Sequence, residues 1–230
     1  MNDTPFYLAE DFSGPFPDTK LALTEPDGLL AVGGNLKPET LLQAYSQGLF
    51  PWYSDDQPIL WWSPNPRCVL YPKKLKISRS LKKTLNKNLY EITIDTAFRQ
   101  VMQACASSPR KDEAGTWIDN EMLQAYCQLH ELGHAHSIEC WNNNELVGGL
   151  YGIKIEQMFF GESMFSKQTD ASKVALEYLC NTIKPKLIDV QVHSEHMASL
   201  GAELIGRDKF IEMVNSYCRK TLSTLSSQKN

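Results

Sequence analysis

Residues 135–162 read AHSIECWNNNELVGGLYGIKIEQMFFGE, three apolar runs separated by two short polar turns. The runs cover residues 135–141, 145–155 and 157–162, and apolar runs of this kind bounded by turn residues are typical of strands. Consecutive strands joined by such short turns pair antiparallel, because a parallel pair needs a long crossover. This part of the chain therefore predicts a mixed sheet with an antiparallel part and excludes a doubly wound parallel sheet.

Outward from this block, strands and helices alternate irregularly. Further strands are expected at residues 68–71, 90–94 and 187–192. Helices are expected at residues 78–86, 95–107, 119–132 and 170–183, each opened by a Ser or Asp suited to N-capping. The sequence thus predicts an α+β fold.

The N-terminal part predicts a separate small unit. A helix over residues 39–47 begins at Pro38, ends at Gly48 and follows turn-rich sequence. The next stretch, residues 48–67, is dense in Pro and Trp, which favours a junction. We expect a small N-terminal domain over residues 1–62 and a larger mixed-sheet domain over residues 63–230.

The composition is that of a globular protein, with 230 residues, 42% apolar and 22% charged. No apolar stretch reaches 18 residues, and the start lacks a basic segment followed by an apolar run, so we expect a cytoplasmic protein without a membrane segment. The six cysteines show no Cys-x-x-Cys spacing, which fits buried reduced thiols.

Charge is distributed unevenly along the chain. Residues 58–90 hold eight basic side chains and no acidic one; since the net charge is −4, the rest carries −4 minus 8, or −12. A basic patch on an acidic body attracts a polyanion such as nucleic acid. A solvated helix face is the alternative, although no Glu is placed four residues away to pair with these bases.

Polar residues interrupt two strand-like segments, FFGESMF at 159–165 and LIDVQV at 187–192. Alternate strand residues share a face, so Asp189 and Gln191 are expected to point the same way. A carboxylate in a mostly buried strand must be hydrogen-bonded or paired, which makes it a candidate for chemistry. A strand-end Asp facing solvent is the alternative.

Residues 130–134 read HELGH and match the H-E-x-x-H zinc pattern literally. Zinc binding needs both histidines on one face of a continuing helix and a third ligand, for which Glu156 and Glu162 are the candidates. Gly133 stands where the helix should end, so His134 is expected outside it. A zinc peptidase is therefore only an alternative, and we expect no metal.

Several segments together resemble one family, the bacterial leucyl/phenylalanyl-tRNA protein transferases. The matching segments follow the order of the family along the chain, from about residue 15 to about residue 210. It is carried by PDGLLAVGG at 26–34, GLFPW at 48–52, WWSP at 61–64, GTWI at 115–118, LVGGLYG at 146–152, GESMFS at 161–166 and IDVQ at 188–191. This chain departs from the family pattern at Leu49, at Val190 and in the link before residue 187, which is shorter than in the family. The resemblance implies an acetyltransferase-like (GNAT-like) larger domain, without a cofactor because the chain lacks a pyrophosphate loop.

The resemblance implies a reaction and its partners. Leu, Phe or, less well, Met would pass from its tRNA to the α-amino group of proteins beginning with Arg or Lys, which marks them for degradation in the N-degron pathway. The partners are then Leu-tRNA, Phe-tRNA and such acceptor proteins, and the enzyme would act as a monomer. A noncatalytic RNA-binding module is the third interpretation, after the transferase and the zinc peptidase.

The same resemblance implies functional roles for the residues at the matching positions of this chain. Asp189 and Gln191 would form the catalytic pair, with Asp189 polarising Gln191 or helping to remove the amine proton; pure positioning by both residues is the alternative. Glu162 would orient the aminoacyl α-ammonium, and a buried acid satisfied by backbone donors is the alternative for it. Leu150 and Phe159 would line the pocket for the transferred side chain. Residues expected to bind tRNA are Trp52, Trp117, Tyr45 and Tyr126 at the terminal adenosine, and Lys74, Arg79, Lys82 and Lys83 at the acceptor-stem backbone. Core packing is the alternative for each aromatic residue.

Overall fold

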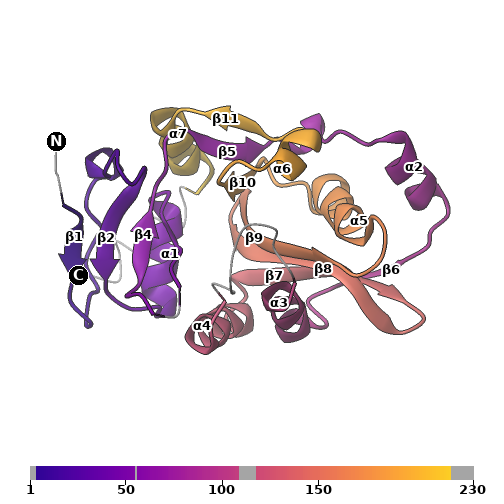
Figure 1. The fold of residues 1–230 in the computed structure, drawn as a ribbon, viewed down its shortest axis with the longest axis horizontal. Helices are drawn as coiled ribbons and strands as arrows, with labels where there is room; N and C mark the ends of the chain where they lie inside the picture. The colour runs from indigo at the N-terminus through magenta and orange to yellow at the C-terminus, as the bar shows by residue number, and fades with distance from the viewer. Residues whose placement is uncertain (1–3, 55, 109–117, 219–230) are drawn as a thin grey trace.

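The computed structural model describes residues 4–54, 56–108 and 118–218, which form two sheets at opposite ends of the molecule (Figure 1). The smaller sheet has the order β1-β2-β4-β3. Its strands are β1 (Phe6–Leu8), β2 (Leu29–Gly33), β3 (Phe50–Pro51) and β4 (Leu60–Trp62). Helix α1 (Pro38–Ser46) begins with the expected Pro at its first position and lies between this sheet and the larger part of the protein.

The larger sheet has seven strands in the order β11-β5-β10-β9-β8-β7-β6. Its strands are β5 (Arg67–Leu70), β6 (Glu91–Ile94), β7 (Ala135–Asn142), β8 (Glu145–Ile155), β9 (Met158–Ser166), β10 (Leu187–Gln191) and β11 (Glu203–Ile205). Neighbours pair antiparallel except β9 and β10, which are parallel. The expected α+β fold, with a small N-terminal domain and a larger mixed-sheet domain, is confirmed. We propose a domain boundary at residue 62.

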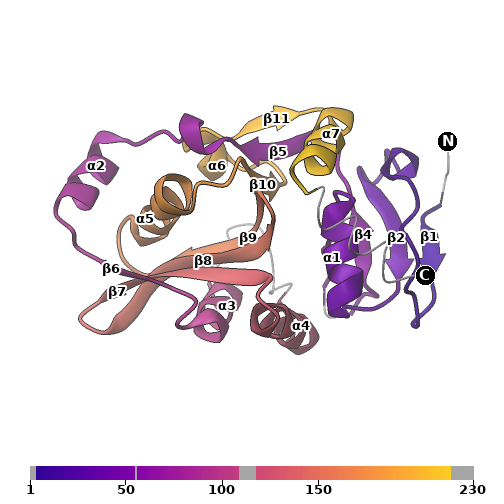
Figure 2. The same ribbon diagram turned by 180° about the vertical axis from the view of Figure 1, so that it is seen from behind.

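Helices cover both faces of the larger sheet (Figure 2). On one side lie α3 (Phe98–Ala106) and α4 (Asn120–Glu131), and on the other α2 (Arg79–Asn86) and α5 (Ala171–Tyr178), which continues as a π-helix to Ile183. Short α6 (Glu195–Ser199) and α7 (Arg207–Tyr217) complete the chain. Because strand side chains alternate, Tyr151 and Phe160 pack toward α3 and α4, whereas Leu150 and Phe159 join the cluster that contains α5.

Two of the four expected helix caps are wrong. The side chains of Ser78 and Asp119 accept hydrogen bonds from the backbone of Leu81 and Met122, as expected. Asp170 has a left-handed φ of 63° and its carboxylate does not cap α5. Asp95 also has positive φ, and α3 begins only at Phe98. Both carboxylates bond to other segments, which sequence-local capping rules do not include.

All six cysteines are buried and none is in a disulfide, as expected for reduced thiols. Every helix within the described ranges is too short or too polar to cross a membrane.

The parallel pair β9–β10 is short, and both strands are irregular where it ends. Pairing runs only from Leu187 opposite Met158 to Asp189 opposite Phe160. Just beyond, the register of β9 against β8 shifts so that Glu162 is an extra residue, and the register of β10 against β5 shifts at Val190. Such bulges bend a strand and redirect its side chains. The two strands therefore separate at the point where the polar residues lie.

Gly152 permits the first of these irregularities. A Cβ atom here would lie 2.1 Å from the carbonyl oxygen of Phe160 and 2.7 Å from the Phe159 ring. We expect Gly152→Ala to lower the free energy of unfolding by about 1–3 kcal/mol, because the backbone of β9 must move. Gly161→Ala, whose nearest neighbour would be 3.5 Å away, is the matched control. Urea unfolding of both variants measures this, and equal stability would contradict it.

Candidate functional site

A cavity of about 870 Å³ opens where β9 and β10 separate. Its walls come from β3, the adjoining parts of β8, β9 and β10, α5, and the segment that leads into α6. Among the residues expected from sequence to form the site, six line this one cavity: Trp52, Leu150, Phe159, Glu162, Asp189 and Gln191. Segments more than 100 residues apart in the chain thus converge there.

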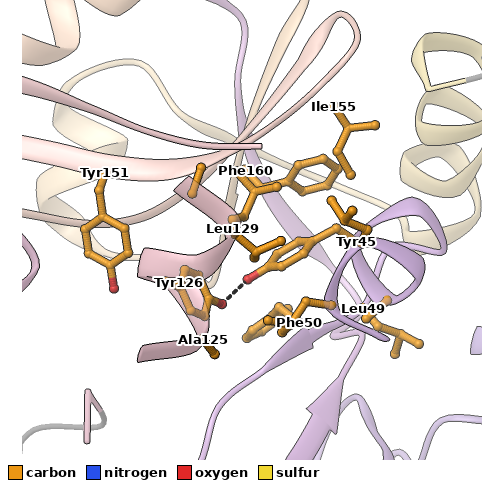
Figure 3. Close-up of a cluster of buried hydrophobic side chains, with 14 of the residues drawn as sticks. Tyr45, Leu49, Phe50, Ala125, Tyr126, Leu129, Tyr151, Ile155 and Phe160 are labelled. Carbon is orange, nitrogen blue, oxygen red and sulfur yellow. Dashed lines mark hydrogen bonds between the residues drawn. The ribbon is translucent and has the colours of Figure 1, made fainter. Parts of the chain in front are cut away.

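Glu162 is held by two tyrosines from different helices. The hydroxyl of Tyr45 on α1 donates to Glu162 Oε1 at 2.7 Å, and that of Tyr126 on α4 donates to Oε2 at 3.2 Å. The two hydroxyls also bond to each other (Figure 3). The side-chain amide of Gln191 reaches Oε1 at 3.4 Å. Glu162, which lines the cavity, is therefore fixed in orientation by groups from α1, α4 and β10.

This environment changes the ionisation of Glu162. Burial raises the pKa of its carboxyl group from 4.5 to about 7, and the nearby charge of Asp189 adds to the effect. The hydrogen bonds from the tyrosines and the charge of Arg67 act in the opposite direction. Burial is the largest of these causes. With a pKa of about 7, Glu162 changes its charge close to neutral pH. Perturbed pKa values of this kind are typical of groups in functional sites.

Asp189 is paired with a residue that sequence reasoning did not place in the site. Arg67 donates from Nε to Oδ1 at 2.8 Å and from Nη2 to Oδ2 at 2.7 Å, and both side chains are fully buried. The backbone N–H of Gln191 also donates to Oδ1, at 3.0 Å. The alternative of a solvent-facing Asp189 is wrong. The pairing of Arg67 with Asp189 could not be predicted from the sequence, because the two residues are 122 positions apart and no local signal connects them.

Gln191 does not follow simple strand alternation. It comes after the bulge at Val190 and has a φ of 60°, a region that non-glycine residues adopt only where their surroundings hold them. The Asp189 carboxylate does this by accepting the Gln191 N–H. Asp189 and Gln191 do lie at one cavity, but through a bulge and not through a regular strand.

The aromatic candidates for tRNA binding separate into three groups. Trp52 is 36% exposed and lines the cavity beside Trp62, with ring centroids 6.0 Å apart. Tyr45 and Tyr126 are fully buried, so their rings present no face to a ligand and the expectation that they stack on adenosine is wrong in this structure. Trp117 lies outside the described residues.

The basic run is not one uniform patch. Arg67 is fully buried and pairs with Asp189, so it does not belong to the surface. Lys74 is exposed but bonds to Glu203 at 2.7 Å. Arg79, Lys82 and Lys83 are exposed on α2, which does not line the cavity.

The residues of the zinc pattern do not form a metal site. Helix α4 ends at Glu131, Gly133 has a φ of 78°, and His134 follows outside the helix. His130 stacks on Phe98 and its Nδ1 bonds to the carbonyl of Ala135. No cluster of three or more His, Cys, Asp or Glu arranged to hold a metal ion occurs in the part of the chain that the structure describes. Glu162, one proposed third ligand, is engaged by the tyrosines.

Comparison with known proteins identifies the family. The profile described as leucyl/phenylalanyl-tRNA protein transferase matches residues 69–215, and the profile of its N-terminal domain matches residues 34–65. The leucyl/phenylalanyl-tRNA protein transferase of Hydrogenovibrio crunogenus is 55% identical, over 94% of this chain and 85% of the relative. That of Nitrosomonas europaea is 56% identical, over 87% and 86%.

Solved structures give weaker similarities. A GCN5-related N-acetyltransferase from Kribbella flavida is 9% identical with a TM-score of 0.35, over 70% of this chain and 58% of that one. L-PGS from Bacillus licheniformis is 12% identical with a TM-score of 0.37, over 74% and 57%. The chain thus spans less than two thirds of the length of these solved proteins.

The class of protein follows from the family profiles and the sequence relatives: the chain is an enzyme, an aminoacyltransferase. It belongs to the leucyl/phenylalanyl-tRNA protein transferase family. The resemblance found in the sequence is confirmed, and the interpretation as a noncatalytic RNA-binding module is wrong.

The raised pKa of Glu162 makes stability depend on pH. Because its pKa is about 7 in the folded protein and 4.5 ordinarily, its contribution is fully present below pH 4.5 and is lost as the pH rises through 7. We expect the wild type to lose about 2 kcal/mol relative to Glu162→Gln between pH 5 and pH 8, after allowance for partial solvent exposure. Urea unfolding at several pH values measures this.

Glu131→Gln, which removes a carboxylate at an exposed position at the end of α4, is measured beside it as the control for the same substitution away from the cavity. A pH-independent difference between Glu162→Gln and the wild type would contradict the assignment.

Proposed function

We propose that this enzyme transfers Leu, Phe and, less well, Met from aminoacyl-tRNA to the α-amino group of proteins that begin with Arg or Lys, and so marks them for degradation in the N-degron pathway. The family supports transfer of an aminoacyl group. The observation that carries the proposal is the position of Glu162: a carboxylate residue in the lining of a cavity whose adjoining wall is apolar. An aminoacyl group has the complementary pair of features, a positively charged α-ammonium and a side chain.

The aminoacyl group fits the cavity in one orientation. Ionised Glu162 binds the α-ammonium, and the transferred side chain enters between Leu150 and Phe159, which are 4% and 2% exposed. An apolar pocket distinguishes one methyl group by only about 1–3 kcal/mol, so some transfer of Met accompanies that of Leu and Phe.

The tRNA terminus is bound by stacking on the exposed face of Trp52, because an unpaired adenosine is recognised through its ring. Trp117 has the same role in this proposal. Tyr45 and Tyr126 are reassigned as positioning residues for Glu162. Lys74, Arg79, Lys82 and Lys83 contact phosphates of the acceptor stem without regard to sequence.

The chemistry needs no cofactor or metal, because the ester of aminoacyl-tRNA is already activated. The neutral acceptor amine attacks the ester carbonyl carbon, a C–N bond forms, the C–O bond to the ribose breaks, and the proton lost by the amine balances the one gained by the ribose hydroxyl. Gln191 orients the reacting groups, and Asp189 holds Gln191. The free α-amine has a pKa near about 8, so enough of it is neutral at pH 7. Orientation of the amine against the ester carbonyl then lowers the barrier.

We also propose the compartment and the oligomeric state in which the enzyme acts. The reaction takes place in the cytoplasm, and the enzyme acts as a monomer.

A transfer assay tests the substrates directly. Labelled Leu on tRNA is offered to a peptide beginning with Arg and to an otherwise identical peptide beginning with Ala, with chelator present. We expect label on the Arg peptide alone, because the ester needs no metal for activation. Absence of label on both peptides, with folded protein and intact Leu-tRNA, would overturn the proposal.

The role of Trp52 is tested by binding. Stacking of one base on an aromatic ring is worth about 1–3 kcal/mol, so Trp52→Ala should weaken binding of a stable amide analogue of leucyl-adenosine by about 5- to 150-fold. Calorimetry measures this. Tyr7, 81% exposed on β1, offers the control Tyr7→Ala, which should bind as the wild type does. Equal affinity of the two variants would exclude stacking on Trp52.

A further inference from the structure

The Arg67 guanidinium is bonded and enclosed by residues from several elements beside the cavity. Besides its two hydrogen bonds to Asp189, its Nη1 donates to the carbonyl of Gly48 at 3.1 Å. Its guanidinium lies between two aromatic rings, 4.7 Å from the centroid of Phe50 and 4.5 Å from that of Phe210. The side chain is fully buried. No side chain in this position moves without moving its neighbours.

These contacts join three parts of the protein at the site. Gly48 and Phe50 belong to the N-terminal part, Phe210 to α7, and Asp189 to β10. Phe50 itself lines the cavity and lies two residues before Trp52. The same guanidinium therefore sets the distance between the cavity wall from β3 and the bulge that carries Gln191.

The pairing also limits what Asp189 can do. Its Oδ1 accepts from Arg67 Nε and from the Gln191 N–H, and its Oδ2 accepts from Arg67 Nη2. Both oxygens of this carboxylate are therefore already engaged within the protein, by Arg67 and by the Gln191 N–H. The position of the Gln191 N–H, by contrast, depends on it directly.

We propose that Arg67 is a positioning residue for aminoacyl transfer: it holds Asp189 as the fixed acceptor for the Gln191 backbone, and thereby places the Gln191 side chain against Glu162. Asp189 acts by position and not as a base. This inference rests on the proposed function for its kinetic readout, and on geometry alone for the placement of Gln191.

The charge balance at the site agrees with this arrangement. The negative charge of Asp189 raises the pKa of Glu162, and the positive charge of Arg67 lowers it. The pair thus brings rigid hydrogen bonds into the site while its two charges act on Glu162 in opposite directions. A lysine keeps the charge but loses the planar fork that makes two parallel bonds.

The first test is Arg67→Lys, with Arg207→Lys as the matched control. Arg207 donates from Nη1 to the carbonyls of Thr19 and Ser63, both at 2.9 Å, so it connects α7 to the N-terminal half of the chain without touching the site. We expect Arg67→Lys to lose at least about tenfold in kcat, with KM for Leu-tRNA changed less than threefold, since orientation is lost and binding is kept. Arg207→Lys should keep the wild-type kcat.

A kcat for Arg67→Lys that equals that of Arg207→Lys at a similar loss of thermal stability would overturn the proposal. Hydrogen exchange at the Gln191 amide gives a readout that needs no substrate. We expect faster exchange in Arg67→Lys and unchanged exchange in Arg207→Lys. If the wild type transfers no Leu at all, the proposed function fails, and the amide exchange still decides the placement of Gln191.

The second test separates position from proton transfer. Arg67→Met leaves the Asp189 carboxylate buried and unpaired, and adding Asp189→Asn removes that charge while its oxygen still accepts the Gln191 N–H. We expect the double variant to be faster than Arg67→Met, whether or not the single variant folds. A folded double variant that is no faster than Arg67→Met would overturn the proposal.

Discussion

The buried pair of Arg67 and Asp189 is the interaction on which the rest of the site depends. Each partner carries a charge that is costly to bury alone, and each is fully removed from solvent. The bidentate geometry, the Gly48 carbonyl and the two flanking aromatic rings compensate for the lost hydration. Removing one partner of such a pair typically costs about 3–5 kcal/mol. The two sheets and α7 are consequently held at one spacing around a single guanidinium.

The cavity itself is a product of irregular strands. A regular continuation of β9 beside β10 would pair their backbones and close the space between them. Instead pairing stops after Asp189 opposite Phe160, and Glu162 and Val190 are extra residues in the pairing of β9 with β8 and of β10 with β5. The glycine at position 152 provides the room that this shift requires. Both bulges therefore contribute to the same feature, a gap between β9 and β10 that is lined by polar groups.

Burial and polarity are balanced within this gap. Glu162 lies deep enough for its pKa to rise to about 7, yet its oxygens are bonded by Tyr45, Tyr126 and Gln191. The tyrosines come from α1 and α4, so the carboxylate is oriented by both the N-terminal and the larger part of the protein. A carboxylate that is fixed in place and ionises near neutrality is suited to bind an ammonium group reversibly. In the proposed function, the apolar wall of Leu150 and Phe159 beside it selects the side chain that accompanies the ammonium group.

The local sequence determined the strands of residues 135–162, the cap at Asp119, the end of the helix at Gly133 and the polar positions 162, 189 and 191, because turns, caps and alternation depend on near neighbours. The family motifs along the chain also identified the enzyme class. Tertiary structure decided what those patterns do not contain. Asp95 and Asp170 failed as caps because distant groups bond them, and Tyr45 and Tyr126 proved to be buried supports of Glu162. Arg67 looked like one base among eight in a surface run. Its role follows from a partner 122 residues away, and such a pairing exists only once burial has made an unpaired charge too costly to leave.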